Sequence, residues 1–272
     1  MKATQQRIGF VGFGHMAQIL CEAILRSKLI SHSNVSFVRR DRAKMKENQE
    51  KFKVTAATLP TLVATSDLIF LAVRPQQAQE VLTELARIPA LQGKWIVSIL
   101  PGIGIDVLAK KLGASVQIAR VMPNIASSVG DGMSVLTFGS SCTMEFKSFA
   151  RQLFGAMGEI VELKEELIDI ACGMSGCGPG FVLRLIDAMA KTGEKHGVEY
   201  EAALNIAAQT FVGAAKLILH GQKPSDLLAQ IATPNGATQA GLDVMSGERI
   251  DDAMRAAIEA SAFRFKELQD PR

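Results

Sequence analysis

The sequence lacks the residue patterns of several common classes of protein. It has four cysteines, namely Cys21, Cys142, Cys172 and Cys177. They form no Cys-x-x-Cys pair, and none lies near a histidine at the spacing of metal ligands, so we expect small core residues in a reduced protein. The sequence also offers no Ser/His/Asp arrangement, which argues against triad hydrolysis.

Long apolar runs and blocks of one charge are absent as well. The longest apolar run, Leu68–Val73, is far too short to cross a membrane. The formal net charge is +3, and no Lys/Arg block is long enough to form a basic arm. The first residues lead into an apolar segment without a secretory pattern. We therefore expect a cytoplasmic protein that binds neither membrane nor nucleic acid.

Short apolar runs alternate with amphipathic stretches over the first part of the chain. Continuous apolar runs of this length are typical of strands that are buried on both faces of a parallel sheet. The predicted strands are Ile8–Val11, Val35–Val38, Leu68–Val73, Trp95–Ile99, Val116–Met122, Met133–Phe138 and Ile160–Leu163. Helical periodicity between them predicts a doubly wound α/β sheet.

After Leu163 the strand pattern stops, and Gly/Pro/Asn clusters separate stretches that predict helices. These are Phe181–His196, Glu201–Leu219, Ser225–Ile231, Ala237–Met245 and Asp251–Leu268. We therefore expect a nucleotide-binding domain at 1–163 and a helical domain at 164–272. Because the helical part is rich in Ala and Gly, it buries little apolar area alone. Self-association through this part is expected to supply the missing burial.

A glycine-rich loop follows the first predicted strand and leads into a helix. It reads Gly12-Phe13-Gly14-His15-Met16-Ala17, the spacing of a dinucleotide-binding loop. Gly12 permits the tight turn, Gly14 lets the backbone approach a pyrophosphate, and Ala17 lets the helix pack close to the strand. Free N–H groups at the helix start then face the anion. For His15 a cofactor contact or plain solvent exposure is expected.

The second predicted strand ends in two arginines, Arg39 and Arg40, with Asp41 only after them. An NAD site places a carboxylate at this strand end for the ribose 2′-hydroxyl. A 2′-phosphate would instead find charge-assisted partners in the two guanidinium groups. We therefore expect NADPH as the cofactor and keep NADH open, since a solvated surface run is the alternative for the two arginines.

Three further loops follow predicted strands, at the sheet edge where ligands bind in such folds. They are Ala72-Val73-Arg74-Pro75-Gln76, Leu100-Pro101-Gly102 and Arg120-Val121-Met122-Pro123-Asn124. Asn124 either orients a nicotinamide carboxamide or forms a turn. No loop supplies a strong general base, which disfavours alcohol oxidation. Reduction of an already protonated imine needs mainly orientation against the nicotinamide.

Several stretches, in order along the chain, together resemble the pyrroline-5-carboxylate reductase family. They are Gly9–Ala17, Ala72–Gln76, Arg120–Asn124, Gly130–Gly132, Ser175–Pro179 and Thr233–Leu242. The early stretches are shared with other Rossmann reductases, whereas the last two are much more specific. The resemblance implies an N-terminal Rossmann-type sheet followed by an all-α dimerisation domain. It also implies NAD(P)H-dependent reduction of 1-pyrroline-5-carboxylate to L-proline, by hydride transfer to the C=N carbon of the iminium.

The resemblance further implies roles for particular residues. The loop Thr233-Pro234-Asn235-Gly236-Ala237-Thr238 would hold the pyrroline ring and its carboxylate, together with Ser175 and Gly178. Thr238 would be the catalytic residue, because its hydroxyl would bond the ring nitrogen; capping of its own helix is the alternative. Nicotinamide would lie near Met122, Pro123 and Asn124. Helices from two subunits would complete each site of a homodimer.

The sequence departs from the usual family pattern at several positions. The loop at 233–238 usually reads Ser-Pro-Gly-Gly-Thr-Thr, so Asn235 replaces a glycine and Ala237 removes a hydroxyl. Asn tolerates the left-handed conformation, so Asn235 is expected to keep the backbone path. Arg74 stands where Lys is usual, Ile125-Ala126 where Thr-Pro is usual, and Cys177 and Gly180 where Ser and Ala are usual.

Three other functions fit part of the pattern. A β-hydroxyacid-type dehydrogenase shares both halves but needs a helix-borne catalytic lysine, and the sequence offers no convincing one. A related imine reductase would act on another ring. A non-catalytic NADPH-binding sensor would keep the glycine loop alone, so the presence of both late loops argues against it.

Overall fold

The computed structural model describes residues 5–268. It divides into two compact units. The first runs to Cys177 and resumes at Ala260, and the second comprises Gly178–Glu259. Residues 164–177, which the sequence groups with the helices, thus belong to the first unit. The physical reason is that Ile168 and Cys172 pack against the sheet.

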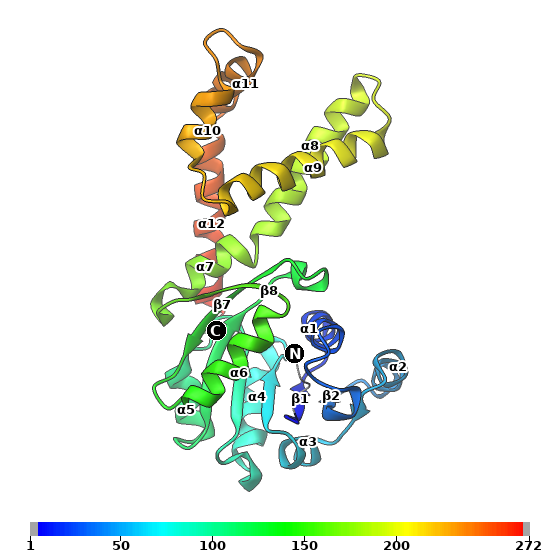
Figure 1. Cartoon of the computed structure of the whole chain (residues 1–272). Helices are drawn as coiled ribbons and strands as arrows, with labels where there is room; N and C mark the ends of the chain where they lie inside the picture. Colours follow the sequence, from blue (N-terminus) through cyan, green and yellow to red (C-terminus); the bar gives the residue numbers. More distant parts are fainter. Residues whose placement is uncertain (1–4, 269–272) are drawn as a thin grey trace. The chain divides into compact units, whose positions relative to one another are not determined.

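Within the described residues, the first unit contains an eight-stranded sheet of order β3-β2-β1-β4-β5-β6-β7-β8 (Figure 1). The strands are β1 Ile8–Val11, β2 Val35–Val38, β3 Thr55–Ala56, β4 Leu68–Leu71, β5 Trp95–Ser98, β6 Gln117–Met122, β7 Gly132–Phe138 and β8 Gly158–Glu162. Neighbouring strands are parallel except β6 and β7. All seven predicted strands are confirmed, and β3 was missed because two residues show no periodicity. Since β1 pairs with both β2 and β4, the strand order reverses beside it.

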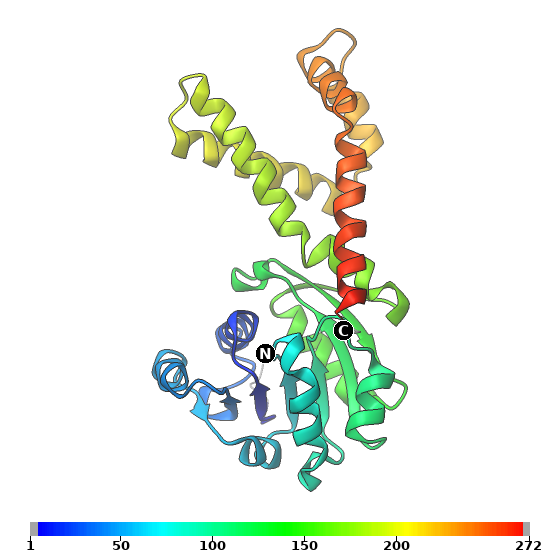
Figure 2. The ribbon, with the colours of Figure 1, turned by 180° about the vertical axis from the view of Figure 1, so that it is seen from behind.

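Helices cover both faces of this sheet (Figures 1 and 2). One hydrophobic core joins the strands to α1 His15–Arg26, α2 Arg42–Phe52 and α6 Met144–Gly155. A second core, on the other face, joins them to α3 Leu59–Thr65, α4 Pro75–Ala86 and α5 Ile105–Leu112. In the first core the rings of Phe10 and Phe70 stack 4.6 Å apart. The predicted Rossmann-type doubly wound sheet is therefore confirmed.

A third, small core lies at the end of the sheet where β6 and β7 meet. It contains Met122 and Val135 from the strands and Ile168 and Cys172 from α7, the helix Ile168–Ser175. Phe265 packs against the same core from the end of α12, Ile250–Glu267. The sequence did not predict α7, because its apolar residues are spread around the helix and form no single stripe.

The second unit contains α8 Gly178–Lys195, α9 Tyr200–Leu219, α10 Pro224–Ile231, α11 Ala237–Gly247 and the part of α12 up to Glu259. The five helices predicted after Leu163 are confirmed as α8 to α12. Among the described side chains of this unit, the buried apolar ones are Ala190, Ala203 and Ala207. Many large apolar side chains are exposed instead, including Leu183, Met189, Ile206, Leu219, Ile231 and Val244. By length and mean hydropathy of 1.5 alone, α9 would be able to cross a membrane.

Candidate functional site

The turn between β1 and α1 requires its two glycines for different reasons. Gly12 has a φ of +89°, and a Cβ there would lie 2.6 Å from the carbonyl oxygen of Ala72. Its N–H donates to the Val38 carbonyl at 3.0 Å, which ties the turn to β2. Gly14 has no protein atom within 4 Å of the position a Cβ would take. The backbone at Gly14 is therefore open to a ligand, as the sequence predicts.

The start of α1 presents unpaired donors beside this open backbone. Gly14 is the N-cap and has no side chain with which to accept the first N–H groups, and the first turn carries no acidic residue. Gly14 and His15 are exposed, whereas Phe13 and Ala17 are buried. Phe13 stacks on Phe37 at 4.3 Å, so its side chain packs in the core and only its backbone faces outward. Such a helix start is an anion-binding site.

A cavity of about 320 Å³ opens at this turn. It is lined by the ends of β1, β2 and β4 and by one face of α4: Val11–Gly14, Val38–Asp41, Leu59, Ala72–Arg74, Gln77, Val81 and Glu84. It thus brings together three of the predicted cofactor loops at the point where the strand order reverses, which is where such sheets bind nucleotides. The sequence missed Gln77, Val81 and Glu84, although their spacing along α4 marks one helical face.

The two arginines at the end of β2 line this cavity and already have protein partners. Arg39 donates through Nη1 to the amide oxygen of Asn48, which is buried. Arg40 donates through Nη2 to a carboxylate oxygen of Glu80, and both side chains are largely exposed. A 2′-phosphate that binds here would therefore compete with Glu80 for Arg40.

Asp41 also lines this cavity, but its side chain is bound to its own helix. It caps α2 by accepting the Lys44 N–H at 3.0 Å. This hydrogen bond, with the charges of Lys44 and Arg39, holds the pKa of the Asp41 carboxyl below its usual value. One carboxylate oxygen of Asp41 is thus engaged with the helix start, while Arg39 and Arg40 are held by Asn48 and Glu80.

The side chain of Asn124 is hydrogen-bonded to other parts of the protein. Its Oδ1 accepts the N–H groups of Ala126 at 3.1 Å and Met133 at 3.3 Å, and its Nδ2 donates to the Ser175 carbonyl at 3.0 Å. It caps the 3-10 helix Ile125–Ser128. Of the two roles that the sequence left open, this is the turn-forming one. Met122, Pro123 and Asn124 are buried, and among the described residues they do not line the cavity at the glycine turn.

The loop Thr233–Thr238 lies in the second unit and leads into α11. Asn235 has a φ of +58°, so the predicted left-handed conformation is confirmed. Gly236 is the N-cap, and a Cβ there would lie 2.5 Å from the Thr233 hydroxyl oxygen. Because Gly236 occupies the cap position, the alternative role of Thr238 as a helix cap is wrong. The Thr238 side chain is exposed at the start of α11.

The start of α11 resembles the start of α1. In both, a glycine N-cap leaves the first N–H groups without a side-chain acceptor, and the first turn carries no acidic residue. Gly178 belongs to the second unit with this loop, whereas Ser175 belongs to the first, where its hydroxyl donates to Ala171 at 2.9 Å. Each unit thus holds a glycine-capped helix start that is suited to an anion.

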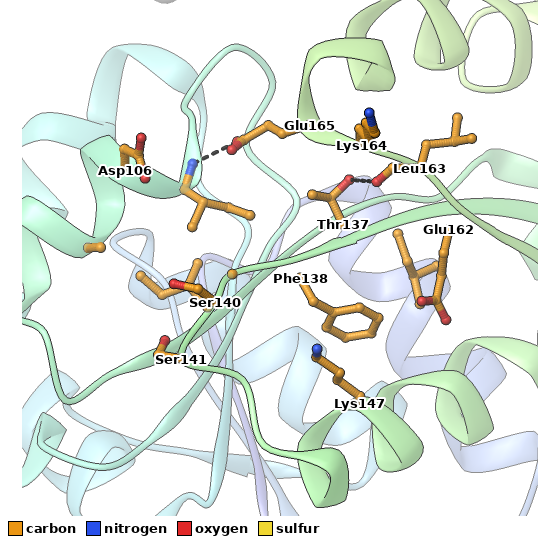
Figure 3. Close-up of a pocket in the computed structure, with 15 residues that line it drawn as sticks. Asp106, Thr137, Phe138, Ser140, Ser141, Lys147, Glu162, Leu163, Lys164 and Glu165 are labelled. Atoms are coloured by element: carbon orange, nitrogen blue, oxygen red, sulfur yellow. Dashed lines mark hydrogen bonds between the residues drawn. The ribbon is translucent and has the colours of Figure 1, made fainter.

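A second cavity, of about 510 Å³, lies between α5 and the ends of β7 and β8 (Figure 3). Two of its polar groups are engaged: Thr137 donates to the Leu163 carbonyl at 2.8 Å, and Glu165 accepts the Ile105 N–H at 2.7 Å. Acidic and basic side chains alternate around it, and it contains none of the residues predicted from the sequence. We therefore assign the candidate site to the smaller cavity and to the loop before α11.

In the comparison with known proteins, the glycine turn and the loop before α11 fall in two different family models. Residues 165–268 match the family model for pyrroline-5-carboxylate reductase dimerisation, and residues 7–102 match that for NADP oxidoreductase, coenzyme F420-dependent. The pyrroline-5-carboxylate reductase of Methanosarcina acetivorans is 32% identical over 265 residues, which cover 97% of this chain and 98% of that protein. The Aquifex aeolicus enzyme is 32% identical over 263 residues, 96% of this chain and 97% of its own.

A solved structure is similar over almost the whole length. The pyrroline carboxylate reductase of Plasmodium falciparum, determined with NADP bound, superposes with a TM-score of 0.91 at 26% identity and covers 99% of this chain and 100% of its own. Prephenate dehydrogenase of Aquifex aeolicus, at 14% identity and a TM-score of 0.55, shares the fold alone. The chain belongs to the pyrroline-5-carboxylate reductase family.

Proposed function

We propose that this protein reduces 1-pyrroline-5-carboxylate to L-proline with NADPH, the last step of proline biosynthesis. The observation that carries the proposal is that two helices of this chain, α1 and α11, begin after a glycine N-cap and leave their first N–H groups free for an anion, in a member of this family. One suits the pyrophosphate of a dinucleotide, and the other suits the carboxylate of a small substrate. The sensor alternative explains only the first, and the dehydrogenase alternative needs a helix-borne catalytic lysine for which the sequence offers no convincing candidate.

The residues at the glycine turn fit NADPH. Bound there, NADPH supplies the hydride. Gly12 permits the tight turn, Gly14 leaves the backbone open to the pyrophosphate, and the N–H groups of His15 and Met16 would face it. Arg39 and Arg40 would hold the 2′-phosphate through charge-assisted hydrogen bonds. Ala72, Val73 and Arg74 line the cavity, and Pro75 begins the helix α4 that follows them.

The loop before α11 would bind the substrate. The backbone N–H groups of Ala237 and Thr238 would donate to its carboxylate, while Pro234 and Asn235 fix the shape of the turn. The Thr238 hydroxyl would bond the ring nitrogen as that nitrogen becomes an amine. Since the iminium is already protonated and electrophilic, orientation at this loop replaces a strong general base.

The second unit would bury its exposed apolar side chains in a homodimer. Family models match residues 165–268 to a dimerisation domain, and the exposed apolar side chains of α8 and α9 require a covering partner. A second copy would cover α9, whose apolar character otherwise passes for that of a membrane helix. We expect the enzyme in the cytoplasm, with no membrane or nucleic-acid partner.

The direct test follows NADPH oxidation with 1-pyrroline-5-carboxylate, beside a six-membered cyclic imine and a β-hydroxyacid with NADP⁺. We expect turnover with the pyrroline and much slower turnover with the others. A folded preparation that binds NADPH yet oxidises none in the presence of the pyrroline would contradict the proposal and favour a sensor. Faster turnover of the six-membered imine would assign the chain to a related imine reductase.

A further inference from the structure

Three alternate residues of β6 and the loop after it contact the length of α7. Side chains alternate along extended backbone, so Arg120, Met122 and Asn124 share one face. The alternation continues past the strand because Asn124 is itself extended, with φ −125° and ψ 173°. Arg120 meets the start of α7, Met122 its middle and Asn124 its end.

At the start of α7 the contact is ionic. Arg120 is 2% exposed, and its Nη1 donates to Glu165 Oε1 at 3.0 Å. Its Nη2 lies 3.6 Å from Asp169 Oδ1, in the first turn of the helix. Glu165 also accepts the Ile105 N–H at the start of α5. The guanidinium therefore ties the beginning of α7 to both β6 and α5.

At the end of α7 the contact is a single hydrogen bond from a side-chain amide. The two bonds that Asn124 Oδ1 accepts, from Ala126 and Met133, fix the orientation of the amide. Nδ2 then donates to the carbonyl of Ser175, the last residue of α7. Between the two ends, Met122 packs with Ile168 and Cys172.

Polar contacts at both ends of α7 restrain the helix in a way that apolar packing alone would not. Apolar packing tolerates a small slide of a helix, whereas an ion pair at its start and a hydrogen bond at its end restrain its position along its axis. A buried ion pair is in general weak evidence for stability, so its effect on geometry is the more informative one. Here the fixed end is Ser175, three residues before the chain enters the second unit at Gly178.

We propose that Arg120 and Asn124 are positioning residues for the reduction: they hold α7 in place and thereby fix Ser175–Cys177, from which the chain enters the unit that carries the substrate loop. The kinetic part of this inference rests on the proposed function. Neither side chain touches the cofactor cavity described above. Their loss therefore misplaces the substrate and leaves the binding of NADPH unchanged.

Two substitutions separate this role from local folding. Asn124→Asp keeps an oxygen for the N–H groups of Ala126 and Met133 but replaces the donor to Ser175 with an acceptor. Glu165→Gln keeps an oxygen for Ile105 and Arg120 but removes the charge. Arg151→Met is the matched control, because it removes the exposed ion pair of Arg151 and Glu162 in the same unit.

In the full-length protein we expect both variants to lower kcat/KM for the pyrroline about tenfold to a hundredfold, the effect of a small misplacement. The dissociation constant of NADPH, measured by fluorescence titration, stays at the wild-type value, and Arg151→Met matches wild type throughout. Amide hydrogen exchange of residues 168–175 becomes faster in the two variants, a readout that needs no turnover.

Folded variants with wild-type kinetics and wild-type exchange at α7 would overturn the inference. So would a loss of activity matched by an equal loss of NADPH affinity, because that would make Asn124 a direct cofactor ligand. An inactive wild-type enzyme would overturn the proposed function instead, and the positioning of α7 would then be decided by the exchange measurement.

Discussion

The two units of this chain bury very different kinds of side chain. Phenylalanines 10, 13, 37, 70, 146 and 154 are fully buried in the first unit. The second unit buries alanines and exposes large apolar residues such as Leu183 and Ile206. A phenylalanine contributes about 1.5–3 kcal/mol on burial, and an alanine far less. The first unit therefore has a core of its own, whereas the second depends on a partner for its burial.

This difference matches the roles proposed for the two ligand-binding loops. The cofactor loop Gly12–Ala17 is anchored in the aromatic core through Phe13, so its shape is set before the ligand arrives. The substrate loop Thr233–Thr238 joins two helices of a unit with little core of its own. Cofactor binding should thus survive changes that abolish reduction, and the predictions below test that separation.

The largest effect is expected from a charge placed on the exposed face of α9. Ile206 is 61% exposed in the single chain, and Ile206→Glu would bury a charge in the proposed dimer interface. We expect a monomer in sedimentation velocity and at least about a hundredfold loss of reductase activity. Val107→Glu, at a residue 53% exposed on α5 of the first unit, is the control and should leave both unchanged. A fully active monomer would refute the dependence of the second unit on a partner.

The next effect concerns the substrate loop alone. Thr238→Ala removes a hydrogen bond to the substrate nitrogen, which costs about 1–3 kcal/mol, or up to roughly a hundredfold in activity. NADPH affinity should not change, because the hydroxyl lies in the other unit. Thr192→Ala, which removes an exposed hydroxyl bonded to its own helix α8, is the control. Steady-state kinetics measure the loss of activity, and equilibrium titration measures the affinity for NADPH. A Thr238→Ala enzyme with wild-type activity would remove Thr238 from the site.

Local patterns predicted most of the fold and part of the site. The strands, the glycine loop and the left-handed Asn235 follow from short-range preferences, and the structure confirms them. The bond between Asn124 and Ser175 joins residues 51 positions apart, so no local pattern reports it. Arg120 was named only as part of a loop, although the spacing of Arg, Met and Asn at alternate positions was a usable signal. The return of the chain to the first unit at Ala260 likewise depends on tertiary packing.

A smaller effect is expected at the end of β2. Arg39→Ala and Arg40→Ala should each lower the preference for NADPH over NADH about tenfold, the contribution of one charge-assisted hydrogen bond. Arg42→Ala, an exposed arginine at the start of α2, is the control. Conversely, Glu80→Gln should strengthen NADPH binding a few fold, since it frees Arg40 from a competing carboxylate. The ratio of dissociation constants for the two cofactors measures this, and an unchanged ratio in both arginine variants would contradict the assignment of NADPH.

The smallest effect is a pH dependence confined to the second unit. Asp187 accepts from Lys191 Nζ at 2.7 Å and from the Tyr200 hydroxyl at 3.1 Å, the latter across α8 and α9. The bond to Lys191, followed by that to Tyr200, holds the pKa of the Asp187 carboxyl below its usual value. For a carboxyl whose pKa is lowered by folding, the stabilisation is fully present above the usual pKa and is lost as the pH falls through the lowered one.

The free energy of unfolding should therefore fall below about pH 4 in wild type, and this fall should be shallower in Asp187→Asn. Because the side chains of Asp187 and Lys191 are exposed, the difference in slope between the two proteins should be small and should shrink further at high salt. Tyr200→Phe, which removes only the bond across the two helices, should give part of the same change. Equal slopes in wild type and Asp187→Asn would show that the contact between α8 and α9 depends on the packing of their small residues, among them Ala190 and Ala203, with no share from this polar group.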